Sequence, residues 1–157
     1  MPNGEIHAGI SLATAGLTYT YAVNSGEPPM LAVATAIGCS LGIIITPDLD
    51  VRGTRADRIV REKIGFLPAV VWGLLWNPYS LLIPHRSIFS HGLIIGTVIR
   101  LLYMAVPLAL LGILPRPGPI LNRILLGLLL SDNLHVGADF LVSGINDITD
   151  NLGKNRN

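Results

Sequence analysis

Five apolar blocks joined by short polar segments dominate this sequence and restrict the folds that it can adopt. The blocks cover residues 8–23, 29–46, 66–83, 92–114 and 118–131. A helix that crosses the roughly 30 Å of membrane hydrocarbon needs about 20 residues, and the first, second and fourth blocks are long enough or nearly so. The pattern predicts an all-α protein, a polytopic membrane helical bundle that forms a single domain over residues 1–157.

The composition agrees with a membrane protein. Half of the residues are hydrophobic and only 13% are charged, whereas about 25% are charged in an ordinary soluble domain. The net charge is +1 and the chain has no long basic run, so we expect membrane lipid as a partner and no nucleic acid. Cys39 is the single cysteine, which excludes an intrachain disulfide and makes a thiolate metal site untenable.

The third block, residues 66–83, differs from the others because it contains Pro68 and Pro78. Each proline removes a backbone donor and disfavours helix in the residue before it. We predict a broken segment that is re-entrant or lies at the interface, where Trp72 and Trp76 suit the headgroup zone. An ordinary kinked membrane helix is the alternative.

The ends of the remaining blocks set the expected topology. The last block must continue as a helix to about Ser143 if it is to cross, which makes about four spans in all. Residues 52–63 carry five of the eleven basic residues, so the positive-inside rule makes this loop and both termini cytoplasmic in a multi-pass protein of a bacterial inner or internal membrane. The loop could instead bind anionic lipid headgroups. The start has no basic residue before its apolar run, so we expect the first helix to be retained rather than cleaved.

Histidines and aspartates collect at the ends of the blocks. The candidate metal ligands are His7, Asp48, Asp50, His85, His91, Asp132, His135 and Asp139. On one helix Asp132, His135 and Asp139 share a face, and helical bundles present metal ligands inward in this way. Unpaired ionisable groups are costly near hydrocarbon, so the sequence predicts a metal site there.

The number of spans decides whether all these residues can form one site. His7 and the pair Asp48 and Asp50 fall on the cytoplasmic side, one before an outward crossing and the other after the return. His85 and His91 join them only if residues 66–83 do not cross. With four spans the last helix returns its acidic and histidine residues to the same face, whereas five spans would separate the groups.

Four motifs together support a family resemblance. MPNGEIH, PDLD, HRSIFSHG and the closing D-x-x-H-x-x-x-D resemble the uncharacterised metal-binding membrane proteins of bacteria, a family related to the inner-membrane metal-dependent hydrolases. The resemblance covers nearly the whole chain. It implies metal contacts from all eight candidate ligands named above.

Eight ligands exceed the three or four that one zinc ion takes, so either two ions or one ion with outer carboxylates is expected. Nitrogen and oxygen donors suit Zn²⁺ first, and Mn²⁺ or Fe²⁺ also. We predict a hydrolase that acts on a phosphate or acyl ester near the cytoplasmic leaflet. Asp48 or Asp50 would be the general base, and Arg86 would hold an anionic, lipid-like or phosphate-containing substrate.

Two other functions use the same ligands. A divalent-metal transporter would place them near the membrane midplane, and a non-catalytic structural or assembly protein would use the metal to tie helix ends together. Arg100 lies inside the fourth block and needs an acid of the site or a lipid phosphate as its partner. We favour the simpler expectation that Arg100 snorkels to an interface or pairs with a helix-end carbonyl.

Overall fold

The structure, a computed structural model, describes the backbone of residues 4–154 and the side chains of residues 4–145. Helices account for all of the regular secondary structure in this part of the chain, which confirms the all-α prediction. In order they are α1 (Gly4–Asn24), α2 (Pro29–Leu41), the 3₁₀ turn η1 (Pro47–Asp50), α3 (Arg55–Ile59), the π turn η2 (Val60–Ile64), α4 (Phe66–Leu82), α5 (Ile88–His91), α6 (Ile95–Leu110) and α7 (Pro119–Lys154).

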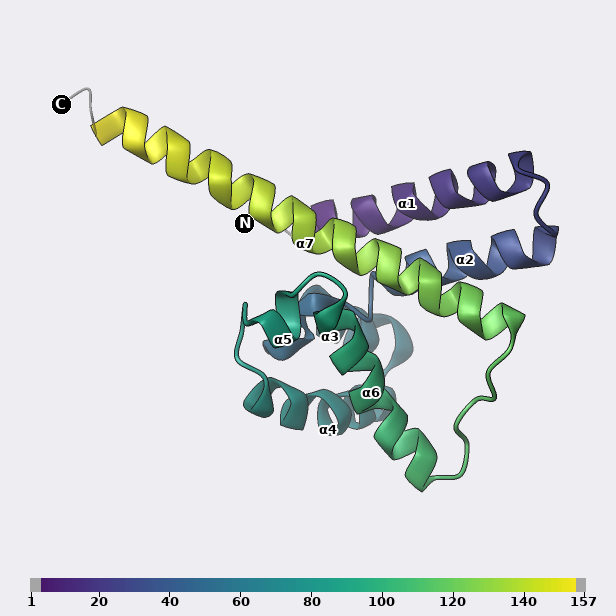
Figure 1. Ribbon diagram of the computed structural model, residues 1–157. Helices are drawn as coiled ribbons and strands as arrows, with labels where there is room; N and C mark the ends of the chain where they lie inside the picture. Colours follow the sequence, from purple (N-terminus) through teal and green to yellow (C-terminus); the bar gives the residue numbers. More distant parts are fainter. Residues whose placement is uncertain (1–3, 155–157) are drawn as a thin grey trace.

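Helices α1 and α2 form a hairpin against which α7 packs (Figure 1). The contact between α2 and α7 is close because glycines face each other. A Cβ on Gly38 would collide with the carbonyl of Ile124, and a Cβ on Gly127 would collide with the carbonyl of Thr35. Only glycine allows two backbones to approach this closely, so these positions set the distance at which α7 lies from the hairpin.

A second group of helices surrounds an aromatic core on the other side of α7 (Figure 1). Trp76 packs edge-on against Tyr79 with ring centroids 5.5 Å apart, and Tyr79 meets Tyr103 of α6 at 5.1 Å. Leu49 of η1 is buried in the same cluster. The 3₁₀ turn is therefore anchored between the two groups of helices, which positions its aspartates.

The prediction that residues 66–83 are broken is wrong, because α4 is one continuous helix from Phe66 to Leu82. Pro68 falls in the first turn, where the backbone N–H has no intrahelical partner to lose. Pro78 lies four residues before the end and removes one bond of the last turns. The helix leads the chain to His85, which comes directly after Pro84.

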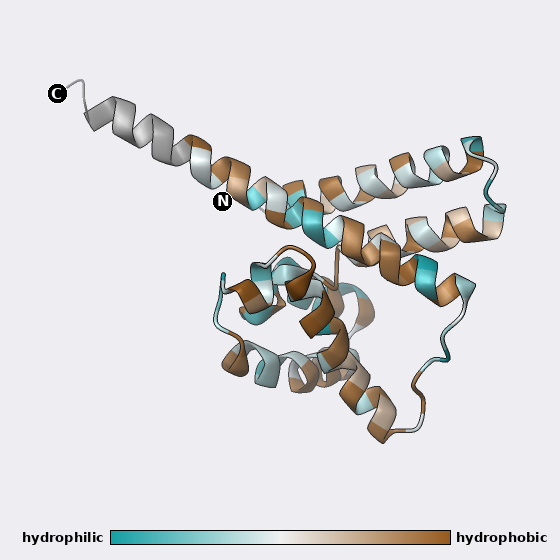
Figure 2. Cartoon of the chain, in the orientation of Figure 1, coloured by the Kyte–Doolittle hydropathy of each residue, from teal (hydrophilic) through white to brown (hydrophobic). Residues whose placement is uncertain are grey.

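The predicted continuation of the last block is confirmed, since α7 runs from Pro119 through Asp139 and beyond without interruption. Within the described residues, one stretch, Pro119–Ile145, is long and apolar enough to cross a membrane. Helices α2, α4 and α6 are apolar but have only 13, 17 and 16 residues. Hydrophobic residues spread over all of these helices (Figure 2). The four-span topology stays a prediction.

Candidate metal centre

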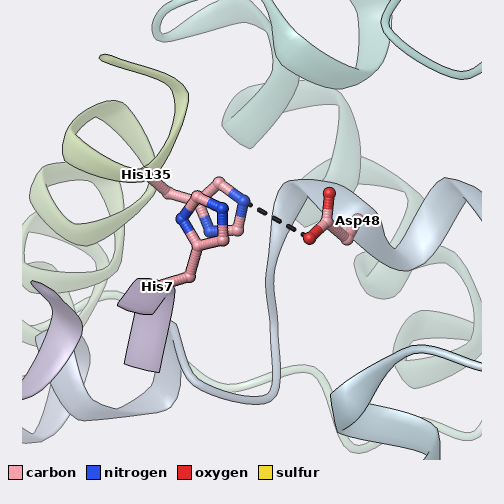
Figure 3. Close-up of side chains that lie close together, drawn as sticks. All are labelled: His7, Asp48 and His135. Carbon is pink, nitrogen blue, oxygen red and sulfur yellow. Dashed lines mark ion pairs between the residues drawn. The ribbon is translucent and has the colours of Figure 1, made fainter. Parts of the chain in front are cut away.

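The candidate ligands meet where the start of α1 crosses the middle of α7. His7 of α1 and His135 of α7 stack face to face, with ring centroids 3.6 Å apart and planes 7° from parallel. Figure 3 shows both rings beside the carboxylate of Asp48. A hydrogen bond between Ser131 and Ser11, 2.8 Å long, holds the two helices together one turn further along.

Local chemistry at η1 aims its two aspartates into this crossing. Thr46 caps the turn, because its Oγ1 accepts a hydrogen bond from the backbone N–H of Asp48 at 3.0 Å, and Pro47 fixes φ at the first position of the turn. The carboxylate of Asp48 then lies between two imidazoles: its Oδ1 is 3.4 Å from Nε2 of His91 and its Oδ2 is 3.4 Å from Nε2 of His135.

Asp50, the second aspartate of η1, sits behind the first. Its fully buried carboxylate lies 2.9 Å from Nδ1 of His85 and 3.5 Å from Nδ1 of His91. Ser90 also contacts the His91 Nδ1 at 3.0 Å. Because these neighbours engage Nδ1, the Nε2 atom of His91 faces the crossing of α1 and α7.

Asp139 completes the cluster from α7, one turn after His135. Its Oδ1 is 3.2 Å from Nε2 of His7, and its Oδ2 lies 3.8 Å from Nε2 of His135 and 4.0 Å from Nε2 of His91. Three imidazole nitrogens and two carboxylates thus converge. We call His7, Asp48, His91, His135 and Asp139 the inner cluster.

Several buried polar atoms of this region have no hydrogen-bond partner among the described residues. They include Nδ1 of His7, Nε2 of His91, Nε2 of His135, Oδ2 of Asp50 and both carboxylate oxygens of Asp139. Leaving such atoms buried and unsatisfied costs about 1–3 kcal/mol each, and more for charged groups. A cation among them would satisfy the acceptors together, and the nitrogen and oxygen donors suit a divalent metal such as zinc. The residues present therefore fit a metal ion.

The ligand atoms are close enough for more than one arrangement. Three triads each have candidate ligand atoms within 4.8 Å of one another. They are His7, Asp48 and His135; Asp50, His85 and His91; and Asp48, His91 and Asp139. Two of the triads consist of inner-cluster residues. In the remaining triad, the buried carboxylate of Asp50 faces Nδ1 of His91. At that position it could also be an outer-shell partner that orients the imidazole.

The aspartates and histidines of the site shift one another's pKa values in the direction that favours a bound cation. Burial alone would raise the pKa of Asp48, but the neighbouring imidazoles of His135 and His91 outweigh it and hold this pKa below its ordinary range. Burial alone would lower the pKa of His91, yet Asp48 and Asp50 raise it to about 9. The aspartates are therefore ionised at neutral pH, and a metal at Nε2 of His91 replaces a proton.

Asp132 lies outside the three triads. Its Oδ2 accepts hydrogen bonds from Arg100 at 2.6 Å and from Thr97 at 3.0 Å, and both charged side chains are buried. The expectation that Arg100 snorkels to an interface is wrong, because α6 packs Arg100 inward against an acid of α7. The structure thus places Asp132 in an ion pair, whereas the sequence placed it with the metal ligands.

Arg86 follows His85 in the chain and lies outside the three triads. It is exposed, with a φ of 59°, and lines a hollow of about 550 Å³ together with His91 and Asp139. Substrate binding by Arg86 stays a prediction.

A second hollow, of about 320 Å³, opens onto the cluster from the side of η1. His7, Asp48, His85 and His135 line it, and so do Arg52, Arg55 and Arg58. From the sequence, these arginines are expected to orient the chain or to bind anionic lipid headgroups, and not to lie beside the metal ligands. The signal that could have linked them to the site is their position, since Arg52 follows Asp50 by two residues.

The sequence model of one protein family matches residues 2–122 of the chain, and this family is described as "Uncharacterized metal-binding protein". The matched part includes five candidate ligands, His7, Asp48, Asp50, His85 and His91. It ends before His135 and Asp139. Neither a curated protein nor a solved structure is significantly similar to the chain.

Proposed function

The chain belongs to the family of uncharacterized metal-binding proteins, and from this premise we propose that it is a metal-dependent hydrolase of phosphate or acyl esters. One observation carries the proposal. The inner cluster brings three imidazoles and two carboxylates together, and three of its residues, His7, Asp48 and His135, line a hollow of about 320 Å³. A catalytic metal needs such access, because part of its coordination must remain open to water and substrate.

The residues divide into two roles in this proposal. The inner cluster holds the ion, with Zn²⁺ the first choice and Mn²⁺ or Fe²⁺ the others. A divalent cation held there would lower the pKa of a water molecule towards about 7 and polarise the ester oxygen. Asp50 lies behind the inner cluster and orients the His91 and His85 imidazoles from their Nδ1 atoms.

His85 is the residue placed to move a proton. Its side chain is 36% exposed and lines the hollow, while Nδ1 is held 2.9 Å from Asp50. A carboxylate that accepts from Nδ1 fixes the tautomer and leaves Nε2 free as a base. We assign the general base to His85 backed by Asp50, in place of the carboxylate of Asp48 or Asp50 itself.

A membrane location is part of the same proposal. The stretch Pro119–Ile145 is long and apolar enough to cross, and large apolar side chains such as Leu17, Leu81 and Leu110 are more than 70% exposed. Extensive exposed apolar surface indicates contact with lipid or another protein. We propose a multi-pass protein of a bacterial membrane whose metal centre faces the cytoplasmic leaflet.

The experiment is an ester panel with metal control. The purified protein should hydrolyse at least one phosphate or acyl ester, lose the activity on chelation and recover it when zinc is returned. His85→Gln should lower kcat while zinc remains bound. Turnover that survives chelation, or no turnover of any ester by zinc-loaded protein, would reject the hydrolase.

A structural metal is the second candidate function. The inner cluster draws its ligands from α1, η1, α5 and α7, so one ion would tie four separate elements together. In that case chelation should lower the unfolding temperature strongly, and the zinc-loaded protein should turn over no ester.

A further inference from the structure

The hollow beside the inner cluster has one wall of arginines. Arg52, Arg55 and Arg58 form this wall, and His7, Asp48 and His135 also line the hollow. A ligand of roughly phosphate-ester size could therefore contact the wall and the inner cluster together.

The three arginines of the wall are not equivalent. Arg55 is held in place, since its Nη1 donates to the carbonyl of Gly4 at 2.9 Å and its Nη2 lies 3.1 Å from Glu5. Arg52 and Arg58 are exposed and make no ion pair within 4.0 Å with any described residue. The guanidinium groups of these two residues remain available to a ligand.

The charge balance of the hollow favours an anion. Asp48 is the one acidic residue among the residues that line it. The two charges of a divalent cation would offset the negative charges of Asp48 and Asp139. Among the residues that line this hollow, the charges of Arg52 and Arg58 then have no counterpart. In a partly enclosed space they attract anions more strongly than in open water.

The planar shape of the guanidinium groups indicates which kind of ester the hollow can bind. A guanidinium is a planar fork that donates two parallel hydrogen bonds to a phosphate. An acyl ester carries no charge at its reacting centre and would leave both arginines without a partner. The wall therefore suits a phosphate ester and not an acyl ester.

We propose that Arg52 and Arg58 form an anion subsite that holds the phosphate group of the substrate against the metal centre. This inference rests on the proposed function and names its substrate class as phosphate esters. The same chemistry is found in a free phosphate ester and in a phospholipid headgroup, and both sources present the anionic oxygens that the two guanidinium groups recognise.

The first test measures binding without turnover. Inorganic phosphate is titrated into zinc-loaded protein by calorimetry, and the Arg52→Gln/Arg58→Gln variant should bind it at least about tenfold more weakly. The control variant, Arg61→Gln/Arg116→Gln, removes two exposed arginines that do not line the hollow. It should bind phosphate as the unmodified protein does. Zinc content and circular dichroism confirm that each variant is folded and loaded.

The second arm identifies the source of the phosphate. Each protein is mixed with phosphatidylcholine vesicles that contain or lack phosphatidic acid. Arginine-dependent binding of free phosphate supports a soluble ester, and arginine-dependent preference for phosphatidic acid supports a lipid headgroup. The inference is overturned if the subsite variant and the control variant behave alike in both arms.

A third measurement separates this inference from the proposed function. Zinc-loaded protein is offered p-nitrophenyl phosphate and p-nitrophenyl acetate, and the subsite variant should raise KM for the phosphate alone. If phosphate binding depends on the two arginines but neither ester is hydrolysed, the subsite stands and the hydrolase proposal fails. If the acetate is hydrolysed and phosphate is not bound, the hydrolase stands and the subsite fails.

Discussion

Asp50 joins two histidines of the centre through a single buried carboxylate, with Nδ1 of His85 at 2.9 Å and Nδ1 of His91 at 3.5 Å. Asp50→Asn keeps the size of the side chain but turns one acceptor oxygen into a donor amide. Loss of an outer-shell carboxylate usually weakens metal binding about 10- to 100-fold. We expect a loss of this size in zinc affinity by competition titration. An unchanged affinity would show that Asp50 does not orient His91.

Asp132 and Arg100 should act in stability and not in metal binding. Asp132→Ala leaves a buried guanidinium without its partner, and breaking a buried pair costs about 3–5 kcal/mol. We expect a fall of this size in the free energy of unfolding with an unchanged zinc content. The double change Asp132→Leu/Arg100→Met removes both charges and should recover most of the stability. Loss of zinc in a stable Asp132→Ala protein would return Asp132 to the ligand set.

Residue types at the block ends allowed most of the candidate site to be predicted. The spacing of Asp132 and His135 predicts a shared helix face, and the helix is continuous as expected. The partners of Asp132 come from α6, whose residues lie more than 30 positions away in the sequence. Sequence spacing could not reveal that Arg100 and Thr97 pack against Asp132.

At the scale of the elements, the crossing of α2 and α7 is the contact most sensitive to substitution. In Gly127→Ala the added methyl group would collide with the carbonyl of Thr35, a backbone atom that cannot rotate away. Overpacking of this kind costs about 1–3 kcal/mol. We expect a lower unfolding temperature than for Gly144→Ala, a control on the same helix with open space at its Cβ. Equal unfolding temperatures would mean that the crossing is looser than the structure indicates.

The position of each proline within α4 explains why the predicted break in residues 66–83 is wrong. The rule that proline breaks helices applies to helix interiors. Pro68 lies in the first turn of α4, and the aromatic packing of Trp76 and Tyr79 stabilises the helix near Pro78. Helix ends depend on tertiary contacts that single-residue preferences do not contain.

At the scale of the whole molecule, the helical class and the continuation of the last block through Asp139 could be predicted from the apolar blocks and the length of a crossing. The predicted end near Ser143 falls short, because α7 runs to Lys154. The number of spans could not be settled in the same way. Helices α2, α4 and α6 have 13, 17 and 16 residues, which is short of the roughly 20 residues that a simple crossing needs. Short helices of this kind can pack inside a protein or enter a membrane part of the way.

Membrane topology therefore calls for a direct measurement. Arg86→Cys and Arg58→Cys, each in a Cys39→Ala background, place a single thiol in each of the two hollows that border the metal centre. If the metal centre faces the cytoplasm, both thiols should react with an impermeant reagent that is added on the cytoplasmic side of the membrane. Labelling of Arg86→Cys from the side opposite to Arg58→Cys would contradict this topology.

The most direct test of the account is the metal content of the purified protein. The unmodified chain should carry at least one divalent ion, because Nε2 of His91, Nε2 of His135 and both carboxylate oxygens of Asp139 are buried and have no hydrogen-bond partner among the described residues. The His135→Ala/Asp139→Ala variant removes two of its five side chains and should lose the ion while circular dichroism still shows a folded helical protein. Elemental analysis that finds the same metal content in the folded variant would contradict the assignment of the centre.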